Sequence, residues 1–104
     1  MIKFVYKSTR PSLDTQWYKR TEEIQKLAED AKNQGKLINE EFKYESGGLT
    51  LFITSIWSNK EDYSDYVNSP EMLEWRIDRT LYNSMNDITF ALYSKLEDVS
   101  NDDL

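Results

Sequence analysis

Cysteine and histidine are both absent from the 104 residues of this chain. Without cysteine there is no disulfide, no thiolate nucleophile and no thiolate metal ligand. Without histidine, the chain lacks the side chain that best moves protons near pH 7 and that most often binds metals and haem. Serine–histidine and cysteine–histidine catalysis and zinc-dependent hydrolysis are therefore excluded. We expect neither a metal site nor a cofactor.

Basic residues and long apolar runs are also scarce. The chain has 13 Lys and Arg against 19 Asp and Glu, which gives a net charge of −6 and a pI of about 4.6. A nucleic-acid-binding protein needs a cluster of basic residues to displace counterions from phosphates, so we expect no nucleic-acid partner. No stretch approaches the ~18 apolar residues of a membrane span, and the first residues lack the apolar segment of a secretion signal. We therefore expect a cytoplasmic protein without a membrane partner.

The length corresponds to a single domain, and we assign residues 1–104 to it. Its last residues, 97–104, form an acidic stretch that we expect to be a flexible tail. Aromatic residues are 13% of the chain, so a few bulky rings must build much of the core.

The first third of the sequence predicts a strand followed by a helix. Residues 2–8 alternate between apolar and polar side chains, which predicts a strand. Residues 15–34 carry an apolar stripe at three- and four-residue spacing, beginning with Trp17, and this predicts a helix. Asp14 or Thr15 is the expected N-cap of that helix.

The middle of the sequence predicts a β-hairpin. Residues 37–46 have mixed polarity and predict an edge strand, whereas residues 49–57 form the most apolar strand of the chain. Gly47 and Gly48 lie between the two, and because both can adopt positive φ they predict a two-residue hairpin turn.

Two helices and a last strand complete the expected order. Ser58 followed by Glu61 matches a capping box, which predicts the start of a short helix. Ser69 before Pro70 predicts the start of a longer helix that ends near residue 85. Residues 88–96 predict the final strand. The longer helix carries one apolar stripe, formed by Leu73, Ile77, Leu81 and Met85.

The predicted order, β-α-β-β-α-β, is the ferredoxin-like plan of the α+β class: a four-stranded antiparallel sheet with helices on one face. The other face of such a sheet should be polar in a monomer, but the third and fourth strands carry bulky apolar residues on both faces. An open apolar face usually marks an interaction surface. We therefore expect a homodimer packed sheet against sheet, with Phe52, Ile56 and Tyr93 in the interface.

Residues 51–76 carry a recognisable sequence of motifs. An apolar strand ends in Trp57, a short helix contains Tyr63-Ser64-Asp65-Tyr66, and Ser69 opens the next helix. This combination resembles the dimeric α/β-barrel superfamily, and within it the branch of antibiotic biosynthesis monooxygenase-like (ABM-like) domains. The resemblance implies the fold and dimer expected above. It does not select an activity, because one fold hosts many functions.

The same superfamily includes haem-degrading proteins, and the resemblance allows a test of that activity. Those proteins use an Asn near the end of the first strand, a Trp in the short helix and a His ligand in the long helix. The matching positions here hold Ser8, Tyr66 and Arg76. A guanidinium group stays protonated and cannot bind iron, so we do not expect haem degradation by this route.

Two functions remain open. The absence of a catalytic constellation favours a binding or accessory module. The resemblance implies instead a cofactor-independent monooxygenase or isomerase acting on a small aromatic or polyketide-like compound. Such an enzyme needs a cavity on the order of 300 Å³ or more between sheet and helices. Its pocket would be lined by Ser8, Trp57, Tyr66, Arg76 and Tyr82, with Arg76 offsetting a developing negative charge.

Each of these residues also has a structural interpretation. Trp57 at the end of an apolar strand favours the core, and Tyr66 favours packing of the short helix on the sheet. Arg76 favours a surface ion pair, for instance with Asp62. Trp75 and Arg79, four residues apart, predict a cation–π pair.

Overall fold

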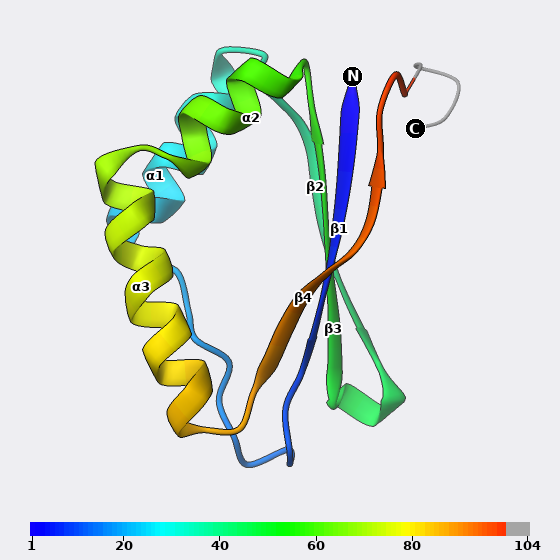
Figure 1. The fold of residues 1–104 in the computed structure, drawn as a ribbon, viewed down its shortest axis with the longest axis vertical. Coiled ribbons are helices and arrows are strands. Elements are labelled where there is room, and N and C mark those ends of the chain that lie inside the picture. The colour runs from blue at the N-terminus through cyan, green and yellow to red at the C-terminus, as the bar shows by residue number, and fades with distance from the viewer. Residues whose placement is uncertain (100–104) are drawn as a thin grey trace.

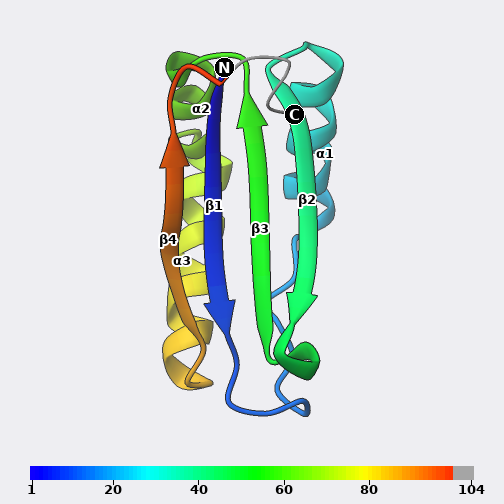
Figure 2. The ribbon, with the colours of Figure 1, turned by 90° about the vertical axis from the view of Figure 1, so that its right-hand side faces the viewer.

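A computed structural model describes residues 1–99 of the chain. Four strands form one antiparallel sheet in the order β2-β3-β1-β4, and Figure 2 looks onto its open face with the helices behind. The strands are β1 (Ile2–Thr9), β2 (Leu37–Glu45), β3 (Thr50–Trp57) and β4 (Thr89–Leu96).

Three helices cover a single face of the sheet, as Figure 1 shows with the sheet seen edge-on. They are α1 (Glu22–Asn33), α2 (Lys60–Val67) and α3 (Pro70–Met85). The α+β, ferredoxin-like prediction is confirmed. In Figure 2, α1 lies behind β2 whereas α3 lies behind β4 and β1, so each long helix covers its own half of the sheet. No helix among residues 1–99 is long and apolar enough to cross a membrane.

The core lies at one end of the layer between sheet and helices. Ile2 and Phe4 of β1 and Trp57 of β3 pack with Ala28 and Ala31 of α1, and all five are buried. Small residues on α1 let this helix approach the sheet closely, and the large aromatic rings fill the remaining volume.

The first helix begins later than predicted. Residues 15–20 are not helical, and α1 starts at Glu22 with Thr21, not Asp14 or Thr15, as its N-cap. The hydroxyl of Thr21 accepts a hydrogen bond from the backbone N–H of Ile24, and two acidic residues in the first turn suit the positive end of the helix dipole.

Two turn predictions also need correction. The β2–β3 connection has four residues, 46–49, and its first three form a turn, Ser46–Gly48, in which all three have positive φ. The N-cap of α2 is Asn59, whose side-chain oxygen accepts from the backbone N–H of Asp62 at 2.8 Å. The Ser58 hydroxyl donates instead to the Asp62 carboxylate, so the predicted capping box with Glu61 does not form.

The start of α3 is as predicted, but the helix does not bury its apolar stripe. Ser69 caps the helix and Pro70 occupies its first turn. The apolar stripe, however, faces away from the sheet: the exposed fractions are 43% for Leu73, 62% for Ile77 and 61% for Leu81, rising to 84% for Met85. The face of α3 turned toward the sheet carries Met72, Arg76, Arg79 and Asn83, all of which line the cavity described below.

The open face of the sheet is less apolar than expected. Phe52 and Tyr93 contact each other edge to face at 5.2 Å, with Phe52 half-buried and Tyr93 exposed. Ile56 is only 3% exposed within a single chain, so it offers almost no surface to a second copy. The amino group of Lys7 lies 5.9 Å from the Phe52 ring centre and adds charge to this face.

The acidic C-terminal stretch begins with ordered residues. Val99 is buried, and its backbone N–H donates to the carbonyl of Met1 at 2.8 Å. Residues 97–99 are therefore attached to the domain, which corrects the start of the predicted flexible tail. Its remainder, residues 100–104, lies outside the described residues.

Candidate functional site

A cavity of about 560 Å³ lies between the sheet and the helices. It exceeds the size that a small-molecule enzyme of this architecture needs. All four strands, α2, α3 and the segment that precedes α1 contribute lining residues, so the cavity is built by the fold as a whole.

The walls of the cavity are mainly aromatic. The three tryptophans of the chain, Trp17, Trp57 and Trp75, all line it. The other rings in its lining are Tyr6, Tyr18, Phe42, Tyr44, Tyr63, Tyr66 and Phe90. Flat, polarisable walls of this kind favour a planar ligand that can stack on them.

Four of the five pocket residues expected from the sequence line this cavity: Ser8, Trp57, Tyr66 and Arg76. Tyr82 is not among the lining residues. Its hydroxyl donates to the backbone carbonyl of Gln16 at 2.7 Å, so it holds the segment before α1 against α3.

Two of these four already have hydrogen-bond partners. The Ser8 hydroxyl donates to the carbonyl of Thr89 at 2.8 Å, and Ser8 is buried. The Trp57 Nε1–H donates to the hydroxyl of Ser55 at 3.1 Å, and Trp57 is 2% exposed. Both residues therefore have a structural role, and what they present to the cavity is largely apolar surface.

The polar groups of Tyr66 and Arg76 are less fully engaged in hydrogen bonds among residues 1–99. Burial raises the pKa of Tyr66, so its hydroxyl stays protonated and can donate a hydrogen bond at neutral pH. Arg76 donates to the backbone carbonyl of Val67 at 3.1 Å and not to the carboxylate of Asp62, which accepts from Ser58 and Asn59. The predicted ion pair of Arg76 is absent, and its charge is not neutralised by an acid among residues 1–99.

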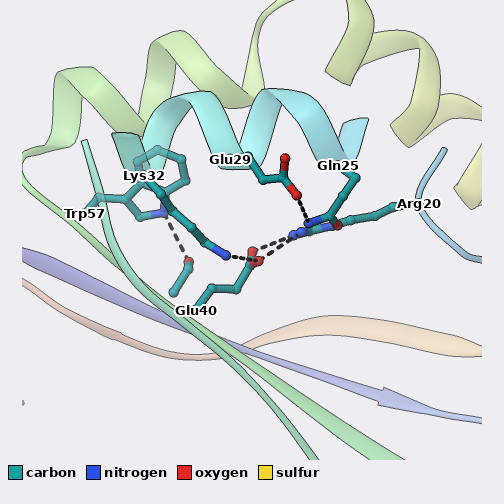
Figure 3. A network of polar contacts seen from close by, with 7 residues as sticks. Arg20, Gln25, Glu29, Lys32, Glu40 and Trp57 are labelled. Carbon is teal, nitrogen blue, oxygen red and sulfur yellow. Dashed lines mark hydrogen bonds and ion pairs between the residues drawn. The ribbon is translucent and has the colours of Figure 1, made fainter. Parts of the chain in front are cut away.

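On the β2 side of the cavity, Arg20, Lys32 and Glu40 form a network of ion pairs, which we call the clasp (Figure 3). Glu40 on β2 accepts two hydrogen bonds from the guanidinium of Arg20, at 2.9 and 2.5 Å, and lies 3.7 Å from the amino group of Lys32 on α1. Burial lowers the pKa of Arg20, but the hydrogen bonds and charge of Glu40 outweigh it and the net shift is upward. The clasp ties the segment before α1 to the sheet.

The floor of the cavity holds a pair of tyrosine hydroxyls. Tyr6 of β1 and Tyr63 of α2 share a hydrogen bond of 2.6 Å. Burial, and then the hydrogen bond to Tyr6, raise the pKa of Tyr63 well above its usual value. Tyr63 therefore keeps its proton at neutral pH, and its hydrogen bond to Tyr6 links α2 to the sheet.

The α3 side of the cavity carries positive charge. Arg79 is packed between two rings, with its guanidinium carbon 4.0 Å from the centre of Phe90 and 5.1 Å from that of Trp75, which confirms the predicted cation–π pair. Burial and the nearby charge of Arg76 lower the pKa of Arg79 to about 10, so it remains a cation at neutral pH in an unfavourable environment. Within the described part of the chain, Arg79 forms no ion pair with an acid.

Three residues that line the cavity were not predicted as site residues from the sequence: Arg79, Asn83 and Trp17. Arg79 and Asn83 follow Arg76 at helical spacing, and this second, polar stripe of α3 could have been found beside the apolar one. Trp17 gave no such signal, because its spacing fits a helix that does not extend that far. Its Nε1–H is buried and has no acceptor among residues 1–99.

The described residues contain no group of three or more His, Cys, Asp or Glu that could hold a metal ion. What the cavity offers is aromatic surface, tyrosine hydroxyls and guanidinium cations.

Comparison with known proteins finds similarity at the level of structure. No family model matches the sequence, and no curated protein matches it. A conserved Bacteroides thetaiotaomicron protein of unknown function, described as a possible oxidoreductase, superposes with a TM-score of 0.63 at 14% identity, over 91% of this chain and 94% of that one.

Two further solved structures bear the name of the ABM-like proteins or an oxygenase activity. A candidate antibiotic biosynthesis monooxygenase from Deinococcus radiodurans has a TM-score of 0.54 at 11% identity, over 96% of this chain and 97% of its own. A mutant of SnoaB, a cofactor-independent oxygenase from Streptomyces nogalater, also has a TM-score of 0.54 at 11% identity, over 96% of both chains. Identities this low establish the fold and not the activity. The chain therefore has the fold of the ABM-like proteins.

Proposed function

We propose that this domain binds a planar aromatic small molecule in the cavity between its sheet and its helices. The observation that carries the proposal is the cavity itself, about 560 Å³ in volume and walled by aromatic rings from both layers. A core that only stabilised the fold would fill this volume, because protein interiors pack as densely as organic crystals.

The test compares two probes of similar size that differ in planarity: 1-naphthol and its saturated analogue decahydro-1-naphthol. We expect the flat probe to bind more tightly in isothermal titration calorimetry, because stacking on the cavity walls requires a flat partner. Ile53 lines the cavity, and Ile53→Phe should weaken binding by reducing the space. Ile38→Phe is the matched control, since Ile38 is 42% exposed and is not in the lining. Equal, weak binding of both probes contradicts the proposal.

A second candidate function is cofactor-independent oxygenation of the bound compound. The cavity meets the size requirement of that reaction, and Arg76 and Arg79 can offset negative charge on a phenolic substrate. The balanced step converts a ring methylene to a carbonyl with one dioxygen, one oxygen atom entering the product and the other leaving as water. An oxygen electrode with 1,8-dihydroxyanthrone tests it. Uptake no faster than the protein-free rate removes this candidate and leaves the binding function intact.

We also infer that two copies pair through the open face of the sheet. The support is the exposed Tyr93, which with Phe52 forms an apolar centre on a face that no helix covers. Light scattering on a size-exclusion column should report a dimer for the unaltered chain and a monomer for Tyr93→Arg. A monomer for the unaltered chain at 100 µM or more would contradict the pairing.

A further inference from the structure

The cavity has a sign of charge opposite to that of the whole protein. Among residues 1–99, four cationic side chains line it, Lys19, Arg20, Arg76 and Arg79, against the single carboxylate of Glu40. The chain as a whole carries a net charge of −6. A concave site with low-dielectric walls concentrates the field of its charges, so this cavity attracts anions although the protein repels them.

The excess positive charge is not spread evenly. Glu40 is paired with Arg20 and lies near Lys32, so the carboxylate of Glu40 offsets the charge of Arg20 in the lining. Arg76 and Arg79 on α3 have no acidic partner in the described residues, and Asn83 lies on the same helical face four residues beyond Arg79. Two of the three lining cations without an acidic partner in residues 1–99 are therefore on the wall formed by α3, and the third is Lys19 in the segment before α1.

Aromatic packing restrains the group that carries this charge. Phe90 and Trp75 both contact the Arg79 guanidinium, and such contacts limit the orientations of a planar cation. A guanidinium so restrained has lost part of its conformational freedom before a ligand arrives, which favours binding of a carboxylate.

Building on the proposed function, we propose that the ligand is a planar aromatic carboxylate. Its carboxylate pairs with Arg79 and Arg76 on α3, and its rings stack on the aromatic walls of the cavity. The cavity then selects its ligand by charge at one wall and by planarity elsewhere.

Two probes of nearly the same shape separate charge from stacking: anthraquinone-2-carboxylate and its uncharged carboxamide. Binding is followed by quenching of tryptophan fluorescence, since all three tryptophans line the cavity. We expect the carboxylate to bind about tenfold or more tightly than the carboxamide, as charge-assisted hydrogen bonds are roughly twice as strong as neutral ones.

Variants assign the effect to residues. Arg79→Gln should weaken the carboxylate more than the carboxamide and so bring the ratio of the two affinities toward one, whereas Lys26→Gln on the exposed face of α1 should preserve the ratio. The unaltered chain by itself tests the charge preference, so the test survives even if a variant does not fold.

The outcomes distinguish this inference from the proposed function. Equal affinity for carboxylate and carboxamide overturns the inference and leaves binding of planar aromatics standing. Binding of neither probe overturns both.

Discussion

The two long helices turn opposite kinds of face toward the sheet, α1 its apolar face and α3 its polar face. On α1, the apolar residues Ile24, Ala28 and Ala31 are buried against the sheet, as expected for an amphipathic helix. On α3, the apolar residues Ile77 and Leu81 are more than half exposed, and the polar face is turned toward the sheet. The inner face of α1 therefore packs in the core, whereas the inner face of α3 lines the cavity.

The difference shows where stability and function are separated in this domain. Burying the apolar stripe of α3 would remove more apolar surface from water and would stabilise the fold. The observed orientation instead places two cations in a cavity, and such strained, polar arrangements are typical of functional sites. The following substitutions test this comparison, beginning with the largest expected effect.

The same truncation should have very different costs on the two helices. Ile24→Ala on α1 removes a side chain that is 2% exposed and should lower the free energy of unfolding by about 2–5 kcal/mol. Ile77→Ala on α3, where the side chain is 62% exposed, should change it by less than about 0.5 kcal/mol. Urea unfolding followed by circular dichroism measures both. Similar losses at the two positions would mean that α3 is packed in solution like α1.

Substitution of Glu40 in the clasp should have the second largest effect on the free energy of unfolding. Its side chain is 7% exposed, and Glu40→Gln leaves Arg20 partly buried without a counter-charge, at a cost of about 1–3 kcal/mol. Glu45→Gln is the control, because Glu45 is 46% exposed and its pair with Lys43 should contribute about 0–1 kcal/mol. Equal midpoints of urea unfolding for the two variants would show that the clasp does not stabilise the fold.

Arginines on the two sides of the cavity should respond differently to the same substitution. Arg20→Met removes a paired cation and should destabilise the protein by about 1–2 kcal/mol. Arg79→Met removes a cation without an acidic partner and should leave stability unchanged within about 0.5 kcal/mol, or raise it. Thermal unfolding gives the comparison. A loss at Arg79 as large as that at Arg20 contradicts the view that the α3 wall is held at a cost to stability.

The smallest effect concerns pH. The pKa of Tyr63 is raised by burial and by its bond to Tyr6, so the folded state retains a proton that the unfolded state loses near pH 10. The contribution of Tyr63 to the free energy of unfolding is therefore fully present below that pH and decreases as the pH rises above it. The free energy of unfolding should therefore decline less steeply between pH 9 and 11 in Tyr63→Phe than in the unaltered chain. Parallel pH profiles would show that the tyrosine pair does not stabilise the fold.

Much of the architecture could be predicted from local patterns. Alternation identified β1, and the Ser69-Pro70 pair located the start of α3, because both signals depend on neighbouring residues only. The start of α1 could not be located in this way. Trp17 has helical spacing to later apolar residues, yet it belongs to a segment that Tyr82 and Trp75 hold by hydrogen bonds to the backbone of Gln16 and Lys19.

The site was less predictable because periodicity gives the faces of a helix and not their directions. The resemblance gave Arg76 and Tyr82 of α3 as pocket residues, and Arg79 and Asn83 were not considered although they line the cavity. Tyr82 lies on another face of α3 and donates to the backbone of Gln16. These failures come from tertiary geometry: the cavity, and not the local sequence, determines which stripe of α3 faces the sheet.

The most direct test of the account is a ¹⁵N–¹H nuclear magnetic resonance titration of the unaltered chain with 1-naphthol. We predict saturable shifts of the indole N–H signals of Trp17, Trp57 and Trp75, because all three side chains line the cavity. The amide signals of Ile77 and Leu81, on the outer face of α3, should stay in place. Shifts confined to that outer face, or no saturable shifts of the indoles, would contradict the claim that the inner face of α3 lines a ligand site.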